Sequence, residues 1–219
     1  MNDRMFNEKM VSCRALLLLQ NTAITNILEK RLVFERLDAI IKANEQLKVY
    51  NIFWDWYFYN YIDSQVMELM RILDQDESSK NFTRLLDSLL SGATVDAGFF
   101  TRIHEALKSA SGMASPMFDS LVPLLTTAEI EADKTLLESE TNVVLVRNYR
   151  DWKVAHNDPQ KWERLGLNLA KLNECIDLVH EKVRRYELFL NGSGYPDTGL
   201  TPTITYDWEA IFRVPWINS

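Results

Sequence analysis

Apolar residues recur every three or four positions along most of this chain, and no other feature constrains its fold as strongly. Such spacing puts apolar side chains on one face of a helix, as for Leu16, Leu19, Ala23 and Ile27. Only seven glycines and six prolines occur among 219 residues, so the breakers that a many-stranded fold needs at its turns are scarce. The pattern predicts an all-α, up-and-down helical bundle.

Polar turns, glycines and Pro159 divide the pattern into predicted helices. These helices are expected over residues 5–48, 50–73, 81–90, 96–110, 126–155 and 159–190. The helix over residues 50–73 is so rich in aromatic side chains that it should be buried on most sides. Residues 109–116 are small and are expected to form a loop.

The domain organisation follows from the same pattern. Residues 1–190 are predicted to form a single helical domain. Residues 191–219 are rich in Gly, Pro and Thr and lack helical spacing. We expect them to form an extended arm that packs on the bundle through four aromatic side chains: Tyr206, Trp208, Phe212 and Trp216.

Composition narrows the class of protein. The formal charge is -7 and the pI about 5.1, so any contact with nucleic acid must come from a local basic patch. The two cysteines, Cys13 and Cys175, form no metal-binding spacing and need no disulfide, which favours a reducing, cytoplasmic compartment. The sequence shows neither the apolar core of a signal peptide nor an apolar run long enough to span a membrane.

One basic stretch reverses the acidic character of the chain. Residues 147–164 carry five basic and three acidic side chains, a local charge of +2. A histidine moves protons near neutral pH, and a guanidinium can hold a phosphate and stabilise its pentavalent state. Attack by the ribose 2′-hydroxyl then requires no metal ion. The stretch therefore indicates phosphodiester cleavage in RNA, with Arg150 and His156 as the candidate groups.

These residues resemble a known family. The segment from Arg150-Asp151 to His156 resembles the R-x(4–6)-H motif of the HEPN superfamily. The sequence around this segment is most similar to the abortive-infection branch of that superfamily. The helix end Arg71-Ile72-Leu73-Asp74 resembles a second element of that branch. The resemblance covers roughly residues 50–190. It implies a helical bundle, metal-independent endoribonuclease activity and a homodimer that brings two motifs together.

The resemblance also assigns roles. His156 would be general acid or base, Arg150 would stabilise the phosphorane, and Asp151 would orient a charged group nearby. Substrate contacts would come from the surrounding side chains, namely Arg147, Asn148, Tyr149, Lys153 and Asn157. No metal or other cofactor is implied. RNA is the expected substrate, and a cognate antitoxin is an expected partner. Asp158 stands where some HEPN toxins carry a tyrosine that a partner enzyme modifies.

Other interpretations remain open on the sequence alone. His156 could simply stabilise a helix C-terminus, where the helix dipole favours a cationic ring. The basic patch could also belong to a binding module without catalysis. On an ideal α-helix Arg150 and His156 would lie about 120° and about 9 Å apart. Either the helix is distorted before Pro159, or a dimer assembles the site from both copies. The aromatic run over residues 53–61 could stack nucleic-acid bases, although its spacing favours a core or a dimer interface.

Overall fold

A computed structural model describes residues 1–44, 52–74, 76, 79–192 and 209 of the chain, apart from the side chains of Ser115 and Trp162. All regular structure in this part of the chain is helical, which confirms the all-α prediction. The elements are α1 Asp3–Ala43, α2 Ile52–Leu73, α3 Phe82–Val95, α4 Phe99–Ser111, α5 Ser115–Leu121, α6 Thr127–Ser139, α7 Thr141–Tyr149, the π-helix η1 Arg150–Ala155, α8 Pro159–Trp162 and α9 Leu169–Asn191.

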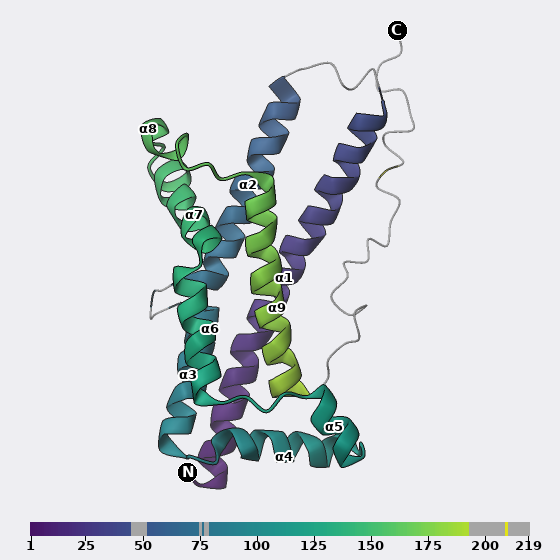
Figure 1. Ribbon diagram of the computed structural model, residues 1–219, viewed down its shortest axis with the longest axis vertical. Helices are drawn as coiled ribbons and strands as arrows, with labels where there is room; N and C mark the ends of the chain where they lie inside the picture. Colours follow the sequence, from purple (N-terminus) through teal and green to yellow (C-terminus); the bar gives the residue numbers. More distant parts are fainter. Residues whose placement is uncertain (45–51, 75, 77–78, 193–208, 210–219) are drawn as a thin grey trace.

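The helices form an up-and-down bundle of four columns, namely α1, α2 with α3, α6 with α7, and α9 (Figure 1). The chain rises through α1, descends through α2 and α3, crosses one end through α4 and α5, rises through α6 and α7, and descends through α9. The column of α1 packs against α9, α3 and α2. At the end opposite α4, the upper part of α2 and the segment from α7 to α8 extend beyond the centre of the bundle.

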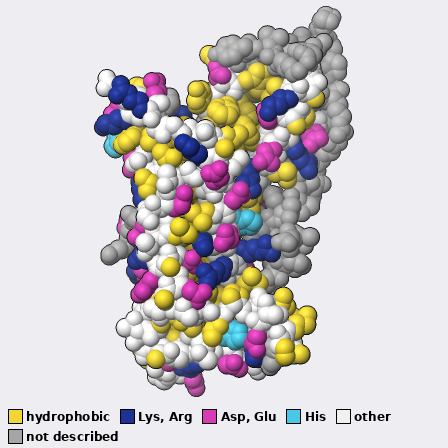
Figure 2. Space-filling model, in the orientation of Figure 1, with side chains coloured by type: hydrophobic (Ala, Val, Ile, Leu, Met, Phe, Trp, Pro, Cys, Tyr) yellow, Lys and Arg dark blue, Asp and Glu magenta, His cyan; other side chains and the backbone are white. Residues whose placement is uncertain are grey.

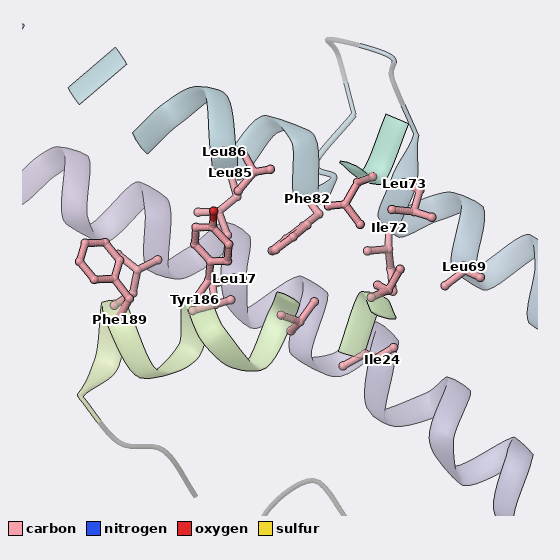
Figure 3. Close-up of a cluster of buried hydrophobic side chains, with 14 of the residues drawn as sticks. Leu17, Ile24, Leu69, Ile72, Leu73, Phe82, Leu85, Leu86, Tyr186 and Phe189 are labelled. Carbon is pink, nitrogen blue, oxygen red and sulfur yellow. The ribbon is translucent and has the colours of Figure 1, made fainter. Parts of the chain in front are cut away.

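The core lies where α1, α2, α3 and α9 meet. Apolar side chains from all four helices point toward one another there, including Leu17, Leu69, Phe82 and Tyr186 (Figure 3). The rings of Phe82 and Tyr186 meet edge to face, with centroids 5.4 Å apart. Burial of each large apolar side chain contributes roughly 1.5–3 kcal/mol, so this centre fixes the positions of the columns.

Gly92 marks a close contact between helices rather than a helix end. The prediction that a helix stops near residue 90 is wrong, because α3 continues to Val95. A β-carbon on Gly92 would lie 2.5 Å from Cε1 of Phe99, the first residue of α4. The chain therefore uses glycine here so that the Phe99 ring can pack directly on the backbone of α3.

We expect the substitution Gly92→Ala to destabilise the protein, because overpacking costs about 1–3 kcal/mol. The gain in helix propensity, about 1 kcal/mol, reduces the net loss to about 2 kcal/mol or less. The ring of Phe99 is fully buried and cannot move aside easily. Urea unfolding measures the effect. Gly98→Ala is the matched control, since its added β-carbon would meet only Asp96 Oδ1 at 3.4 Å. Equal unfolding free energies for the two variants would contradict the close-contact interpretation.

The predicted helix over residues 126–155 is three elements, not one. Thr126 caps α6 in a capping box with Glu129. Glu140 then leaves the helical conformation, with φ -61° and ψ 137°. Its carboxylate accepts the backbone N–H groups of Asn142 (2.7 Å) and Val143 (2.9 Å) and so starts α7. An acidic side chain in a helical pattern thus acts as a helix N-cap.

The predicted helix over residues 159–190 is also divided. It contains α8, a connection in which Gly166 takes a φ of +66°, and α9. The Asn168 side chain accepts the backbone N–H of Lys171 at 3.0 Å and caps the start of α9. The predicted loop over residues 109–116 ends earlier than expected, because α5 begins at Ser115. The connection between α8 and α9 requires a left-handed conformation at Gly166, which glycine adopts readily.

The prediction that α2 is buried on most sides is wrong for its first half. Its Ile52, Trp56 and Tyr59 side chains are 82%, 60% and 47% exposed. At this end α2 packs against α1 through one ring, Phe34, which stacks on Tyr61 with centroids 3.9 Å apart. The aromatic residues of α2 therefore divide between a face that contacts α1 and a face that meets solvent.

The expected aromatic contacts of the arm lie outside the described residues. Glu209 is described, and its Oε1 lies 3.3 Å from Nη1 of Arg36 in α1.

Both cysteines are free and buried, and burial raises the pKa of the Cys175 thiol to about 12. Among the helices described, none contains a stretch long and apolar enough to cross a membrane.

Candidate active site

A π-helical turn carries the predicted catalytic motif. The helix α7 ends at Tyr149, and η1 then runs from Arg150 to Ala155 with hydrogen bonds that close over one more residue than in an α-helix. Such turns are rare and occur frequently at functional sites. The angle expected for Arg150 and His156 on an ideal α-helix does not apply to this geometry. The helix is distorted before Pro159, as the first of the two alternatives requires, and assembly of the site across a dimer stays a prediction.

The residues after η1 end the helix abruptly. The backbone N–H of His156 donates to the carbonyl of Lys153, and the N–H of Asp158 donates to the carbonyl of Trp152 at 2.6 Å. Asn157 has a φ of +46°, the left-handed conformation that asparagine tolerates at a helix C-terminus. Pro159 then begins α8. His156 is therefore held at an exposed helix end by its own backbone and by its neighbours in sequence.

Arg150 and Asp151 form an ion pair within the motif. The Arg150 Nε donates to Asp151 Oδ1 at 2.7 Å, and Nη2 lies 2.6 Å from the same oxygen. The two side chains are 30% and 41% exposed. A carboxylate oxygen that contacts the Nε–Nη2 edge of a guanidinium restricts its orientation and leaves the Nη1 group directed elsewhere. The orienting role predicted for Asp151 has this contact as its physical basis.

Asp63 of α2 anchors the motif to the bundle. Its Oδ1 accepts a hydrogen bond from the Tyr149 hydroxyl at 2.9 Å and one from the Lys153 ammonium at 3.0 Å. Lys153 also donates to the Tyr149 hydroxyl at 2.6 Å. Its ammonium lies over the ring of Tyr59, 4.6 Å from the centroid. Two helices are thus joined through a compact polar and aromatic cluster.

Tyr149, at the buried end of this cluster, keeps its hydroxyl proton. Burial raises the pKa of Tyr149, and the hydrogen bond to Asp63 and the negative charge of that carboxylate raise it further. Tyr149 is therefore a hydrogen-bond donor to Asp63 at all physiological pH values. Its hydroxyl faces α2.

Arg147 points back toward α6. Its Nη1 donates to the carbonyl of Glu138 at 3.3 Å, and its Nη2 is buried without a hydrogen-bond partner among the described residues. Asn148 is half-buried, and Asn157 is exposed. The His156 imidazole is exposed and makes no hydrogen bond or ion pair with the described residues. All five predicted substrate contacts stay predictions, namely Arg147, Asn148, Tyr149, Lys153 and Asn157.

The predicted site residues therefore fall into separate groups. Arg150 lies with Asp151, Tyr149 lies with Lys153 and Asp63, and His156 lies at the exposed end of the segment. Sequence reasoning missed Asp63 and placed Tyr59 only within the aromatic run over residues 53–61. The signal that could have linked the two is an acidic side chain four residues after a tyrosine, on the same face of an aromatic helix. Arg71 lies in the last turn of α2, and just beyond the helix Asp74 Oδ1 accepts the backbone N–H of Asp76 at 3.3 Å.

Within the described part of the chain, no group of three or more His, Cys, Asp or Glu side chains is placed to hold a metal ion. Cleavage through the ribose 2′-hydroxyl needs a proton acceptor and a charge donor, both of which the motif supplies. An imidazole and a guanidinium in one segment are groups that could support acid–base catalysis on a bound anion.

The helical bundle of the described residues has the architecture that the HEPN resemblance implied. The sequence model of one HEPN family, described as AbiU2, matches residues 13–207. The chain belongs to the AbiU2 family of HEPN proteins, which confirms its resemblance to the abortive-infection branch. Neither the search of curated proteins nor that of solved structures returned a match. The R-x(4–6)-H motif itself stays a prediction.

Proposed function

We propose that this chain is a metal-independent endoribonuclease that acts as an abortive-infection effector. The observation that carries the proposal is the π-helical turn at the motif, which holds Arg150 against Asp151 and ends at the exposed His156. Membership of the AbiU2 family adds the biological setting. We further propose a cytoplasmic location, a homodimer and control by a cognate antitoxin.

The proposed reaction moves one proton and exchanges one bond. An imidazole accepts the proton of the ribose 2′-hydroxyl, and the 2′-oxygen forms a bond to phosphorus. The bond from phosphorus to the 5′-oxygen breaks, and that oxygen takes up a proton from an imidazolium. The products are a 2′,3′-cyclic phosphate and a 5′-hydroxyl. Arg150 stabilises the negative charge that develops on the phosphorane oxygens.

The exposure of His156 suits a site completed by a second copy. A single imidazole must serve first as base and then as acid, whereas two motifs side by side provide one group for each step. The His156 ring is exposed, so the imidazole of a partner copy can approach it. The homodimer implied by the family resemblance therefore has a chemical reason at this site.

One observation favours the alternative, a HEPN module that binds a nucleotide, RNA or protein without cleaving it. Asp151 neutralises Arg150 within the chain, with an N–O distance of 2.6 Å. A phosphate would have to use Nη1 or displace the carboxylate. The catalytic proposal requires that this competition still leaves enough positive charge at the reacting phosphate.

We expect the purified protein to cleave RNA in the presence of excess EDTA, because the proposed nucleophile is the substrate's own 2′-hydroxyl. The fragments should carry 2′,3′-cyclic phosphate and 5′-hydroxyl ends, which mass spectrometry of a synthetic oligonucleotide identifies. The same oligonucleotide with 2′-deoxy sugars should remain intact, since it lacks the attacking group.

A preparation of His156→Gln, purified in parallel, controls for contaminating ribonuclease. Cleavage abolished by EDTA and restored by Mg²⁺ would contradict the 2′-hydroxyl mechanism. Binding of RNA by the wild-type protein without any cleavage would favour the binding module.

A further inference from the structure

We propose that the exposed aromatic face of α2 stacks the bases of single-stranded RNA and so positions the scissile phosphate at the Arg150–His156 segment. Trp56 and Tyr59 are its central residues. This inference rests on the proposed function, which it deepens by naming single-stranded RNA as the substrate and by assigning two positioning residues.

The face is defined by helical spacing. Ile52, Trp56, Tyr59 and Asp63 follow one another at intervals of four, three and four residues, which puts them in one row along α2. Trp56 and Tyr59 lie about 4.5 Å apart along the helix axis, and Trp56 and Asp63 about 10.5 Å apart. Hydrophobic side chains gather at the surface over this upper end of α2 (Figure 2). Trp56 is 60% exposed and Tyr59 is 47% exposed.

The row leads directly to the motif. At its inner end Asp63 bonds to Tyr149 and Lys153, which lie on either side of the start of η1. The Lys153 ammonium lies 4.6 Å from the ring centroid of Tyr59, so the aromatic face and η1 contact each other. An RNA strand whose bases lie on Trp56 and Tyr59 would therefore carry its phosphates toward Lys153 and Arg150.

Charge and chemistry favour RNA as the occupant. Residues 147–164 carry +2 in a chain of -7, and the Lys153 ammonium of this segment lies over the Tyr59 ring, so a polyanion is attracted to the inner end of the face. Aromatic rings accept any base by stacking, which suits a nuclease substrate that is held without being read. The opposite side of α2 already packs on Phe34 and is not available for an occupant.

Fluorescence anisotropy with a fluorescein-labelled oligoadenylate of about 10 nucleotides tests the inference. All proteins carry His156→Ala so that the probe remains uncut. We expect Trp56→Ala to raise the dissociation constant by roughly 5- to 150-fold, the value of one stacked base. Trp56→Phe should keep most of the affinity because it keeps a ring. Leu18→Ala is the control, since Leu18 is 65% exposed on α1 and lies outside the face.

A second probe, with the same sugar–phosphate chain but without bases, separates stacking from charge. It should bind more weakly than oligoadenylate and should lose nothing further in Trp56→Ala. An unchanged dissociation constant for oligoadenylate in Trp56→Ala would overturn the inference, and so would an equal loss for both probes. Failure of the parent protein to bind oligoadenylate at all would also overturn it.

Light scattering on the same samples reports the other occupant. A Trp56→Ala protein that changes from dimer to monomer while keeping its RNA affinity would assign the face to a second copy and overturn the inference. The proposed function has a separate outcome. Cleavage of RNA by a protein whose affinity does not depend on Trp56 refutes only this inference, whereas stacking without cleavage refutes only the nuclease.

Discussion

Replacement of His156 by alanine should lower the rate of RNA cleavage by about 10²–10⁴-fold, the usual loss on removal of a general acid or base. The fold should be unaffected, because the imidazole is exposed and makes no hydrogen bond or ion pair with the described residues. Initial rates on a short synthetic RNA measure the effect, and circular dichroism verifies the helical content. Gln160→Ala is a suitable control, since Gln160 is exposed four residues further along the same segment.

Arg150→Ala should cause a comparable loss, about 10²–10³-fold, because one preorganised charge donor contributes about 2.7–4 kcal/mol to the transition state. Arg150→Lys should recover only part of the rate, since an ammonium cannot contact Asp151 and a phosphate at the same time in the geometry of a guanidinium. Asp151→Asn removes the charge that competes with the phosphate and loosens the orientation of Arg150. The two effects oppose each other.

The variants distinguish catalysis from simple binding. If Arg150→Ala and His156→Ala lower RNA affinity but leave the cleavage rate at saturating RNA unchanged, the groups hold substrate and the proposed chemistry is wrong. Wild-type cleavage by His156→Ala in a folded protein would have the same consequence. A selective loss of rate with affinity retained is the expected pattern.

The helical columns could be predicted from the sequence because they depend on averaged properties. Burial of Leu69 and Phe82 requires only that apolar residues return to one face of each helix, and that periodicity is visible without coordinates. On α1 the predicted face was wrong in part, because Leu17 is buried and Leu19 is 47% exposed. The capping box at Thr126 is equally local, since the residues that form it are three positions apart. The resemblance to the abortive-infection branch rested on a similar short-range pattern and was confirmed by the family match.

The details of the site could not be predicted, because they depend on contacts between distant residues and on small backbone preferences. The amino-acid sequence of residues 150–155 does not distinguish a π-helix from an α-helix, since both accept the same side chains. Asp63 contacts Tyr149 and Lys153 across 86 and 90 residues of sequence. Glu140 is a favourable residue within a helix, and only the packing of α6 and α7 shows that it caps a new helix instead.

A buried ion network between α6 and α9 should be the most sensitive electrostatic element of the fold. Asp133, whose side chain is 6% exposed, lies 3.0 Å from Lys182 Nζ and 3.0 Å from Arg185 Nη1. The Tyr186 hydroxyl donates to the same carboxylate at 3.1 Å, and Arg185 continues to Glu129 at 2.6 Å. One carboxylate thus satisfies three donors on α9.

We expect Asp133→Ala to lower the free energy of unfolding by about 3–5 kcal/mol, because it leaves the nearly buried Lys182 ammonium without the carboxylate that compensates its charge. Asp133→Asn should cost less, since its amide oxygen still accepts the Tyr186 hydroxyl. Asp38→Ala is the matched control. It breaks an exposed pair with Lys42 on α1, which is worth less than about 1 kcal/mol. Urea unfolding of the three variants orders these costs. Equal losses for Asp133→Ala and Asp38→Ala would show that solvent screens the network as it screens the surface pair, and that apolar packing alone holds α9 to α6.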